Sequence, residues 1–317
     1  MQALPFAIPT LLLALIAATD ACAQAWPTRP IRILTVEAGG SSDLPARLIA
    51  KEMHANLGQP AVVENRGIIG VELVAQAAPD GHTLVHYTSP LWIIPLFRSN
   101  VSWDAARDFT PITLTIATPN VLVVHPSVPA KTVKELVALA KARPGELNYA
   151  STSTGSANHL AAELFKASAG VDILRVSYKG AGSALNALLA GEMHLMFATA
   201  GSIPGHVKAG KLRPLAVASV QPSPLAPGLP TIAASGLPGY ESMSYTAFFA
   251  PAKTPPAIVN RLNQEAVQAL NAPAVKERLF ATGVQVVANS PREAGATIRS
   301  ETERIRKLIG DAGLREQ

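Results

Sequence analysis

Two short polar segments, in opposite halves of the chain, have the composition of anion-binding loops. The first is Gly39-Gly40-Ser41-Ser42-Asp43, between an apolar run at 31–36 and a helix-like run at 44–57. The glycines let the backbone approach a bound group, and the first turn of a helix leaves amide N–H groups unpaired at the positive end of its dipole. Such a junction binds a carboxylate or phosphate without a basic side chain. The alternative is that Ser42 or Asp43 only caps the helix.

The second segment lies in the other half of the chain. Ser151-Thr152-Ser153-Thr154-Gly155-Ser156 follows a predicted strand at 147–150 and precedes a helix that we expect to begin near Ala157. His159 falls in the first turn of that helix, where we expect it to orient the loop by hydrogen bonding rather than to act as a base. The chain therefore contains two strand–loop–helix junctions of the kind that binds anions.

The N-terminal residues 1–25 have the features of an export signal. An apolar run at 11–18, too short to span a bilayer, precedes Ala23-Gln24-Ala25, which is a small-x-small cleavage site. We expect a periplasmic protein, cleaved after Ala25. Cleavage removes one acid, Asp20, and no Lys or Arg, so the net charge of the 317-residue chain changes from +5 to +6. It also removes Cys22, the only cysteine, which excludes disulfide bonds and thiol catalysis in the mature protein.

The sequence lacks the common motifs for catalysis, metal binding and nucleotide binding. It contains no G-x-S-x-G, no Lys follows the glycines as in a P-loop, and Gly39-Gly40-Ser41 does not match G-x-G-x-x-G. Seven histidines occur, including His82 and His86 on one predicted strand, without a Cys or acid cluster. We expect no catalytic residue, no metal and no cofactor. A mildly basic exported protein is also not expected to bind nucleic acid.

Alternating strand and helix patterns predict an α/β fold with two units. Helices are expected to begin at the capping boxes of Thr132 and Ser290, whereas 89–111 and the Pro- and Gly-rich 221–240 are expected to be irregular. At roughly 150 residues per domain, the chain that remains after cleavage has the length of two domains. The predicted strands and extended segments are 31–36, 61–63, 82–88, 112–118, 121–124, 147–150, 173–176, 194–197, 215–218 and 246–250.

A set of short motifs, spread in order over nearly the whole mature chain, resembles one known family. That family comprises the periplasmic solute-binding proteins of tripartite tricarboxylate transporters, also called the Bug family. Each motif is weak alone, but the ordered set is specific. The motifs are Trp26-Pro27-Thr28-Arg29-Pro30-Ile31-Arg32, Gly39–Asp43, Leu57-Gly58-Gln59-Pro60, Glu64-Asn65-Arg66, Ala78-Pro79-Asp80-Gly81, Tyr149-Ala150-Ser151, Gly155-Ser156 with His159-Leu160, Tyr178-Lys179-Gly180, Gly210-Lys211-Leu212-Arg213 and Gly236-Leu237-Pro238-Gly239.

The resemblance implies a Venus-flytrap clamshell in which each domain is a β-sheet flanked by helices. Domain 1 would be discontinuous, comprising 26–123 and 246–317, and domain 2 would be 124–245. A small organic carboxylate would be held in the cleft between them and delivered to the large and small membrane permease subunits. We expect the receptor to be a monomer.

The resemblance also implies that the two polar loops face each other across the cleft. Three departures from the family pattern lie near this site: Glu37-Ala38 before the glycines, a short segment at 67–70, and Ala198 where an Asp is frequent. The expected ligand-binding residues are Glu37, Gly39, Gly40, Ser41, Ser42, Asp43, Ser151, Thr152, Thr154, Gly155, Ser156, His159 and Ala198.

Glu37 is the residue that most distinguishes this chain from the family pattern. It could point to solvent or pair with a base such as Arg66, or it could be protonated beside the ligand. We favour over protonation a third role, in which it selects a ligand with one carboxylate and a neutral or cationic far end.

Two functional alternatives also remain: an exported hydrolase with Ser42 or Ser156 as nucleophile, and a protein that presents its ligand to a membrane sensor.

Overall fold

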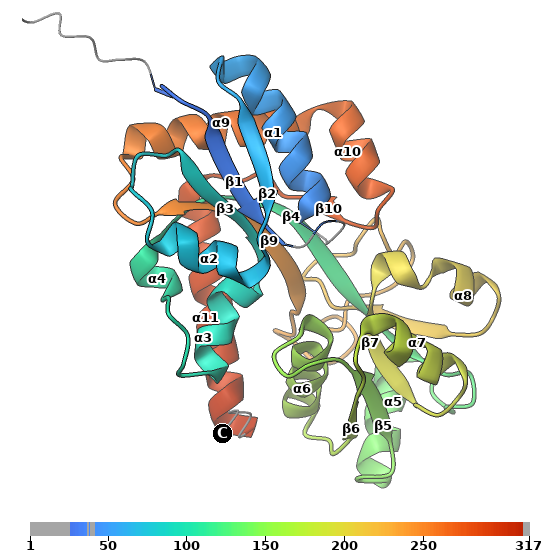
Figure 1. The fold of residues 1–317 in the computed structure, drawn as a ribbon. Helices are drawn as coiled ribbons and strands as arrows, with labels where there is room; N and C mark the ends of the chain where they lie inside the picture. The colour runs from blue at the N-terminus through green and yellow to red at the C-terminus, as the bar shows by residue number, and fades with distance from the viewer. Residues whose placement is uncertain (1–25, 37, 39–41, 313–317) are drawn as a thin grey trace, which may run out of the picture.

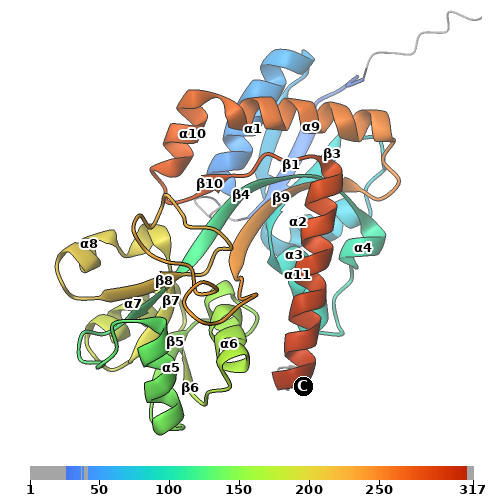
Figure 2. The same ribbon diagram turned by 180° about the vertical axis from the view of Figure 1, so that it is seen from behind.

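The computed structural model describes residues 26–36, 38 and 42–312, and Figures 1 and 2 show it from opposite sides. The fold is α/β, as predicted. Its strands are β1 (Ile31–Thr35), β2 (Ala61–Asn65), β3 (Thr83–Thr88), β4 (Phe109–Val124), β5 (Asn148–Ser151), β6 (Leu174–Ser177), β7 (Leu195–Thr199), β8 (Arg213–Val217), β9 (Met243–Pro251) and β10 (Gln285–Val286). Its helices are α1 (Asp43–Leu57), α2 (Gly67–Ala75), α3 (Pro90–Phe97), α4 (Ala105–Asp108), α5 (Val133–Ala142), α6 (Ala157–Ala169), α7 (Ala181–Leu189), α8 (Pro204–Lys208), α9 (Pro256–Asn271), α10 (Pro273–Phe280) and α11 (Pro291–Ala312), with a short 3-10 helix at Ala200–Ser202.

Two long strands, β4 and β9, lie at the junction between the two halves of the fold. Paired strands follow the order β2-β1-β3-β9-β4-β7-β5-β6, and β8 and β10 also pair with β4. The first part of β4, Phe109 to Pro119, pairs with β9, and its end, Asn120 to Val124, pairs with β7. The segments predicted at 112–118 and 121–124 are therefore one strand that passes between the halves (Figure 1).

The first half packs its sheet between two layers of helices. Helices α1 and α9 cover one face, where Met53 and Leu262 are buried with Ile33. Helices α2, α3 and α11 cover the other face, where Trp92 is buried with Leu34. Adjacent residues of a strand point to opposite faces, so Ile33 and Leu34 anchor β1 in two different clusters. This packing fixes the end of β1, from which the glycine segment leads into α1.

The second half repeats the layered arrangement around β5, β6 and β7. Helices α5 and α6 cover one face, where Phe165 is buried with Phe197. Helices α7 and α8 cover the other, where Leu188 is buried with Met196. Strands β5 and β6 are parallel and are followed by α6 and α7 respectively, so both helices begin at the carboxyl edge of this sheet.

Most predicted elements are present, but residues 89–111 are not irregular. They form α3, α4 and the beginning of β4. Helix α3 begins with Pro90 at its first position and contains Pro95, and it is apolar on nearly all sides because it lies between β3, α11 and α4. A helix that is apolar on nearly all sides lacks the amphipathic pattern by which helices are recognised in a sequence. The two-residue strand β10 was also not predicted.

The last helix, α11, contacts both halves of the molecule. It begins at the predicted capping box, in which the Ser290 amide donates to Glu293 Oε2 at 3.0 Å and the Glu293 amide donates to Ser290 Oγ at 3.3 Å. It packs on α3 and also on α6. Figure 2 shows its length along the first half. Of the helices in the described residues, none is long and apolar enough to cross a bilayer.

Candidate functional site

A cavity of about 270 Å³ opens where β4, β5 and β7 meet the starts of α6 and α7. It lies in the second half of the molecule and reaches the crossover strand β4. Its polar and small lining residues come from segments that are distant in the sequence. They include Asn120, Thr152, Ser156, Asn158, Gly182 and Thr199.

Two helix N-termini line this cavity, and neither N-cap residue caps its helix with a side chain. In the first turn of α6, the His159 amide donates to Asn158 Oδ1 at 2.9 Å. Helix α6 begins after Ser156, whose hydroxyl donates to Asn158 Oδ1 at 2.6 Å rather than capping a backbone amide. Helix α7 begins after Gly180, which has no side chain, and the Gly180 amide donates to Ser183 Oγ at 3.3 Å. Because the first amides of a helix lack intrahelical acceptors, both ends can donate to a bound carboxylate.

Asn120 is a residue of this cavity that the sequence patterns did not reveal. It lies on β4 opposite Thr199, and only 1 % of its surface is exposed. Its Nδ2 has no hydrogen-bond partner within the described part of the chain. An unsatisfied buried donor costs about 1–3 kcal/mol, so this amide is poised to donate to a group that enters the cavity.

Arg175 fixes the polar loop at Ser151–Ser156 by three hydrogen bonds. From β6, its Nε donates to Ser151 Oγ at 2.9 Å, its Nη2 to the Thr152 carbonyl at 2.7 Å and its Nη1 to Thr154 Oγ1 at 3.1 Å. Three residues predicted to bind ligand are thus fixed by one guanidinium. Nothing in the sequence pointed to Arg175, because it meets the loop only through the pairing of β5 with β6.

His159 orients the same loop, in the way expected from the sequence. Its Nδ1 accepts a hydrogen bond from the Gly155 amide at 3.1 Å. Burial, and then the charge of Arg175, lower the pKa of His159 to about 4, so the ring is neutral at pH 7 and carries its proton on Nε2. Gly155 has φ of +78°, and a side chain there would begin 3.4 Å from the ring of Phe97 on α3. The loop therefore packs against the first half of the molecule.

The described part of the first loop is held by buried polar contacts. Ser42 is fully buried, its hydroxyl lies 3.1 Å from Thr35 Oγ1, and it makes no side-chain cap to α1. Asp43 accepts from Asn65 Nδ2 at 2.8 Å and pairs with Arg47 Nε at 3.1 Å. Four residues predicted for the site, Glu37, Gly39, Gly40 and Ser41, lie outside the described residues.

Ala198 is the predicted site residue whose side chain lies in an apolar cluster of the core. It is 1 % exposed and belongs to the apolar cluster around Val121 and Leu188. Side chains alternate along β7, and its neighbour Thr199 lines the cavity instead. The strand predicted at 194–197 extends to Thr199, and Met196 and Phe197 also line the cavity.

Among the residues that the structure describes, neither serine proposed as a nucleophile has a base beside its hydroxyl. Ser42 Oγ contacts Thr35, and Ser156 Oγ donates to the Asn158 amide oxygen. His86 lies near Ser42 but contacts its backbone carbonyl, 3.0 Å from Nδ1. Within the described ranges, no group of three His, Cys, Asp or Glu residues is placed to hold a metal ion.

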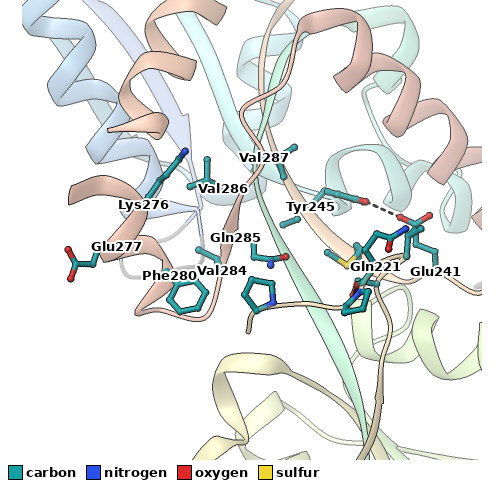
Figure 3. A pocket seen from close by; sticks show the side chains of 16 residues that line it. Gln221, Glu241, Tyr245, Lys276, Glu277, Phe280, Val284, Gln285, Val286 and Val287 are labelled. Atoms are coloured by element: carbon teal, nitrogen blue, oxygen red, sulfur yellow. Dashed lines mark hydrogen bonds between the residues drawn. The ribbon is translucent and has the colours of Figure 1, made fainter. Parts of the chain in front are cut away.

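A larger cavity, of about 790 Å³, lies between residues 219–224 and the α10–β10 region (Figure 3). Its wall is mainly apolar and includes Val284, Val286 and Phe280. The hydroxyl of Tyr245 donates to Glu241 Oε1 at 3.0 Å on one side of it. The charged residues of the wall are Lys276 and two carboxylates, Glu241 and Glu277. A mainly apolar wall with more carboxylates than cations suits an anion less well than the two helix N-termini do.

The α/β halves joined by crossover strands, with a cavity at two helix N-termini, define a solute-binding protein of the periplasmic type. More particularly, residues 45–314 match the family described as the tripartite tricarboxylate transporter family receptor, and the chain belongs to it. It is a receptor of the TctC or Bug type and not an enzyme.

Relatives match over most of their length. The chain is 38 % identical over 292 residues to a UPF0065 protein in the tcbD-tcbE intergenic region of a Pseudomonas species, covering 90 % of this chain and 87 % of the relative. It is 33 % identical over 305 residues to Protein BugT of Bordetella pertussis, covering 94 % of each.

Three solved structures have the same fold. An R. palustris protein with adipate is 35 % identical with a TM-score of 0.74, covering 92 % of this chain and 99 % of that protein. MatC from Rhodopseudomonas palustris with bound malate is 30 % identical with a TM-score of 0.71, covering 90 % and 100 %. A TctC solute-binding protein from Polaromonas with no ligand is 25 % identical with a TM-score of 0.82, covering 90 % and 99 %.

Proposed function

We propose that this protein captures a small organic carboxylate between its two halves and delivers it to a membrane transporter. One observation carries the proposal: the Asn120 Nδ2, which has no hydrogen-bond partner among the described residues, lies in the same cavity as the starts of α6 and α7, whose N-cap residues make no side-chain cap. Amide donors and helix dipoles together bind a carboxylate without needing a basic side chain. Relatives solved with adipate and malate support this class of ligand.

The described arrangement is interpreted as the unliganded one. The structure is more similar to the Polaromonas protein with no ligand than to the adipate complex, although the sequence is less similar. We propose that 26–123 with 246–317 and 124–245 are the domains that close on the ligand, with β4 and β9 as the hinge. The loops at Gly39–Asp43 and Ser151–Ser156 would then meet across the cleft.

Further elements of the proposal come from the family alone. The partners would be the large and small permease subunits of a tripartite tricarboxylate-type transporter, and the receptor would act as a monomer. Export with cleavage after Ala25 would place it in the periplasm. We propose that Glu37 selects a monocarboxylate with a neutral or cationic far end. Its carboxylate would take the role of the Asp that is frequent in the family at the position of Ala198.

Asn120→Leu tests the site, because it removes the amide while keeping a similar volume. Loss of a hydrogen bond to a charged group should weaken carboxylate binding roughly 10- to 100-fold. Loss of an unsatisfied buried donor should, in contrast, stabilise the unliganded protein by about 1 kcal/mol. Calorimetric titration with mono-, di- and tricarboxylates, including adipate and malate, measures the first effect, and urea unfolding measures the second.

The opposite signs distinguish a binding residue from a structural one. A structural asparagine would lose stability when replaced, and its loss of affinity would follow from that. Unchanged affinity in Asn120→Leu would remove this cavity from the binding site. If the wild-type protein binds none of the carboxylates, the proposed function itself is wrong.

A further inference from the structure

A continuous chain of buried hydrogen bonds runs from the start of α1 to the two crossover strands. It begins at Ser42, whose carbonyl also accepts the first helical bond of α1 from the Ala46 amide at 3.1 Å. His86 Nδ1 lies 3.0 Å from that carbonyl, and His86 Nε2 lies 2.8 Å from Thr115 Oγ1 on β4. Thr115 Oγ1 in turn donates to the Thr246 carbonyl of β9 at 3.1 Å. His86 and Thr115 are fully buried.

The far end of this chain coincides with an irregularity in the hinge. Leu114 of β4 pairs with Ala247 of β9, and Ile116 pairs with Thr246, so the register shifts at Thr115. The extra residue makes a β-bulge, which bends the strand and leaves ladder groups unpaired. The Thr115 hydroxyl therefore contacts β9 where the strand pair is best able to change its bend.

The number of protons on His86 limits how many of these contacts can form at once. Burial lowers the pKa of His86 to about 4, so the ring is neutral at pH 7 and has a single N–H. If Nδ1 is protonated, it donates to the Ser42 carbonyl, and the Thr115 hydroxyl must donate to Nε2 and release Thr246. If Nε2 is protonated, it donates to Thr115, which can bond Thr246, but the Ser42 carbonyl then faces a bare nitrogen.

We propose that His86 is a positioning residue that couples the start of α1 to the bend of the β4–β9 hinge through Thr115. With its proton on Nδ1, His86 donates to the Ser42 carbonyl. With its proton on Nε2, His86 donates to Thr115, whose hydroxyl then donates to the Thr246 carbonyl. The two hydrogen bonds to carbonyls cannot form at the same time. A ligand that orders the start of α1 therefore also changes the bonding at the bulge. This inference rests on the proposed carboxylate binding for its ligand, but the coupling itself exists in the unliganded protein.

Thr115→Val breaks the chain with little change in shape, because it replaces one hydroxyl by a methyl. Thr113→Val is the matched control: Thr113 is also a fully buried threonine on β4, but its Oγ1 donates to the carbonyls of Leu114 and Asn289. Thr115→Ser keeps the hydroxyl and serves as the rescue variant. A merely structural role would make the two valine variants behave alike.

The measurements are hydrogen–deuterium exchange of the first turn of α1, without ligand, and titration with the same carboxylates. In Thr115→Val the Nε2 atom of His86 has lost its partner, so the proton stays on Nδ1 and donates to the Ser42 carbonyl. The Ala46 amide should therefore exchange about fivefold more slowly and carboxylate affinity should rise about fivefold, the scale of one hydrogen bond. Thr115→Ser should restore both values, and Thr113→Val should change neither beyond its effect on global stability.

Equal exchange at Ala46 in Thr115→Val and Thr113→Val would overturn the coupling. A wild-type protein that binds none of the carboxylates would overturn the proposed function instead. The exchange comparison would still decide the role of His86 in that case, because it needs no ligand.

Discussion

Glu301 is a buried carboxylate whose pKa the fold raises close to physiological pH. It lies on α11, is 5 % exposed, and accepts a hydrogen bond from Trp92 Nε1 at 2.9 Å. Burial raises its pKa to about 7, against the opposing influence of Trp92 and Arg304. Between its ordinary pKa of 4.5 and about 7, the folded protein therefore holds this proton more tightly than the unfolded chain does.

Glu301→Gln should remove a pH dependence of stability. The favourable contribution of the protonated side chain is complete below pH 4.5 and is lost as pH rises through about 7. Relative to the variant, the wild-type protein should lose up to about 3 kcal/mol of unfolding free energy between about pH 5 and pH 8. Urea unfolding at both pH values measures this, with Glu303→Gln, an exposed carboxylate on the same helix, as control. Parallel pH profiles for wild type and Glu301→Gln would show that Glu301 does not hold the proton.

Sequence patterns predicted the candidate site residues that lie on the two polar loops. They did not predict residues that reach the candidate site only through the pairing of distant strands. Gly155 and His159 were predicted because small residues and a helix start leave a local pattern. Asn120 and Arg175 have no such pattern, because each joins the site through strand pairing. The burial of Ala198 depends on the face of β7 that it occupies, which a short apolar strand does not reveal.

At the level of elements, the predictions succeeded where local chemistry sets a boundary. The Thr132 side chain accepts from the Glu135 amide at 3.1 Å, and the Ser290 box is formed as expected. They failed for α3, where apolar residues on nearly every side remove the periodicity, and for β10, which is too short to have a pattern. The crossing of β4 from one half to the other follows from its pairing partners and is not visible in its sequence.

The loop between β5 and α6 offers a test with a matched control on the same helix. Gly155→Val should abolish carboxylate binding, because a β-branched residue is strained at φ of +78° and its methyl groups extend from a Cβ that would already contact Phe97 at 3.4 Å. Gly170→Val at the other end of α6 has comparable strain at φ of +60° but nothing within 4 Å of the new side chain. Both variants should lose about 1 kcal/mol of stability or more, measured by urea unfolding. Loss of binding in both would point to strain in α6 rather than to the loop.

For the whole molecule, two halves joined by β4 and β9 should move towards each other when a ligand contacts both. The closed form gains contacts that the open form lacks, so a saturating carboxylate shifts the equilibrium towards it. Small-angle scattering should therefore show a smaller radius of gyration with ligand than without. The Asn120→Leu variant at the same ligand concentration should keep the larger radius of gyration of the open form. Identical profiles for the wild-type protein at saturation would contradict hinge closure.

The strand order has a consequence for how the chain reaches its native state. In the sheet, β9 lies between β3 and β4, although the ribosome makes it long after both. The first half therefore lacks a central strand until the second half has been synthesised, and contacts of such long sequence separation form slowly. In a chain that is exported as we propose, this delay keeps the first half unfolded and competent for translocation. Completion of the receptor then waits until almost the entire chain has crossed the membrane.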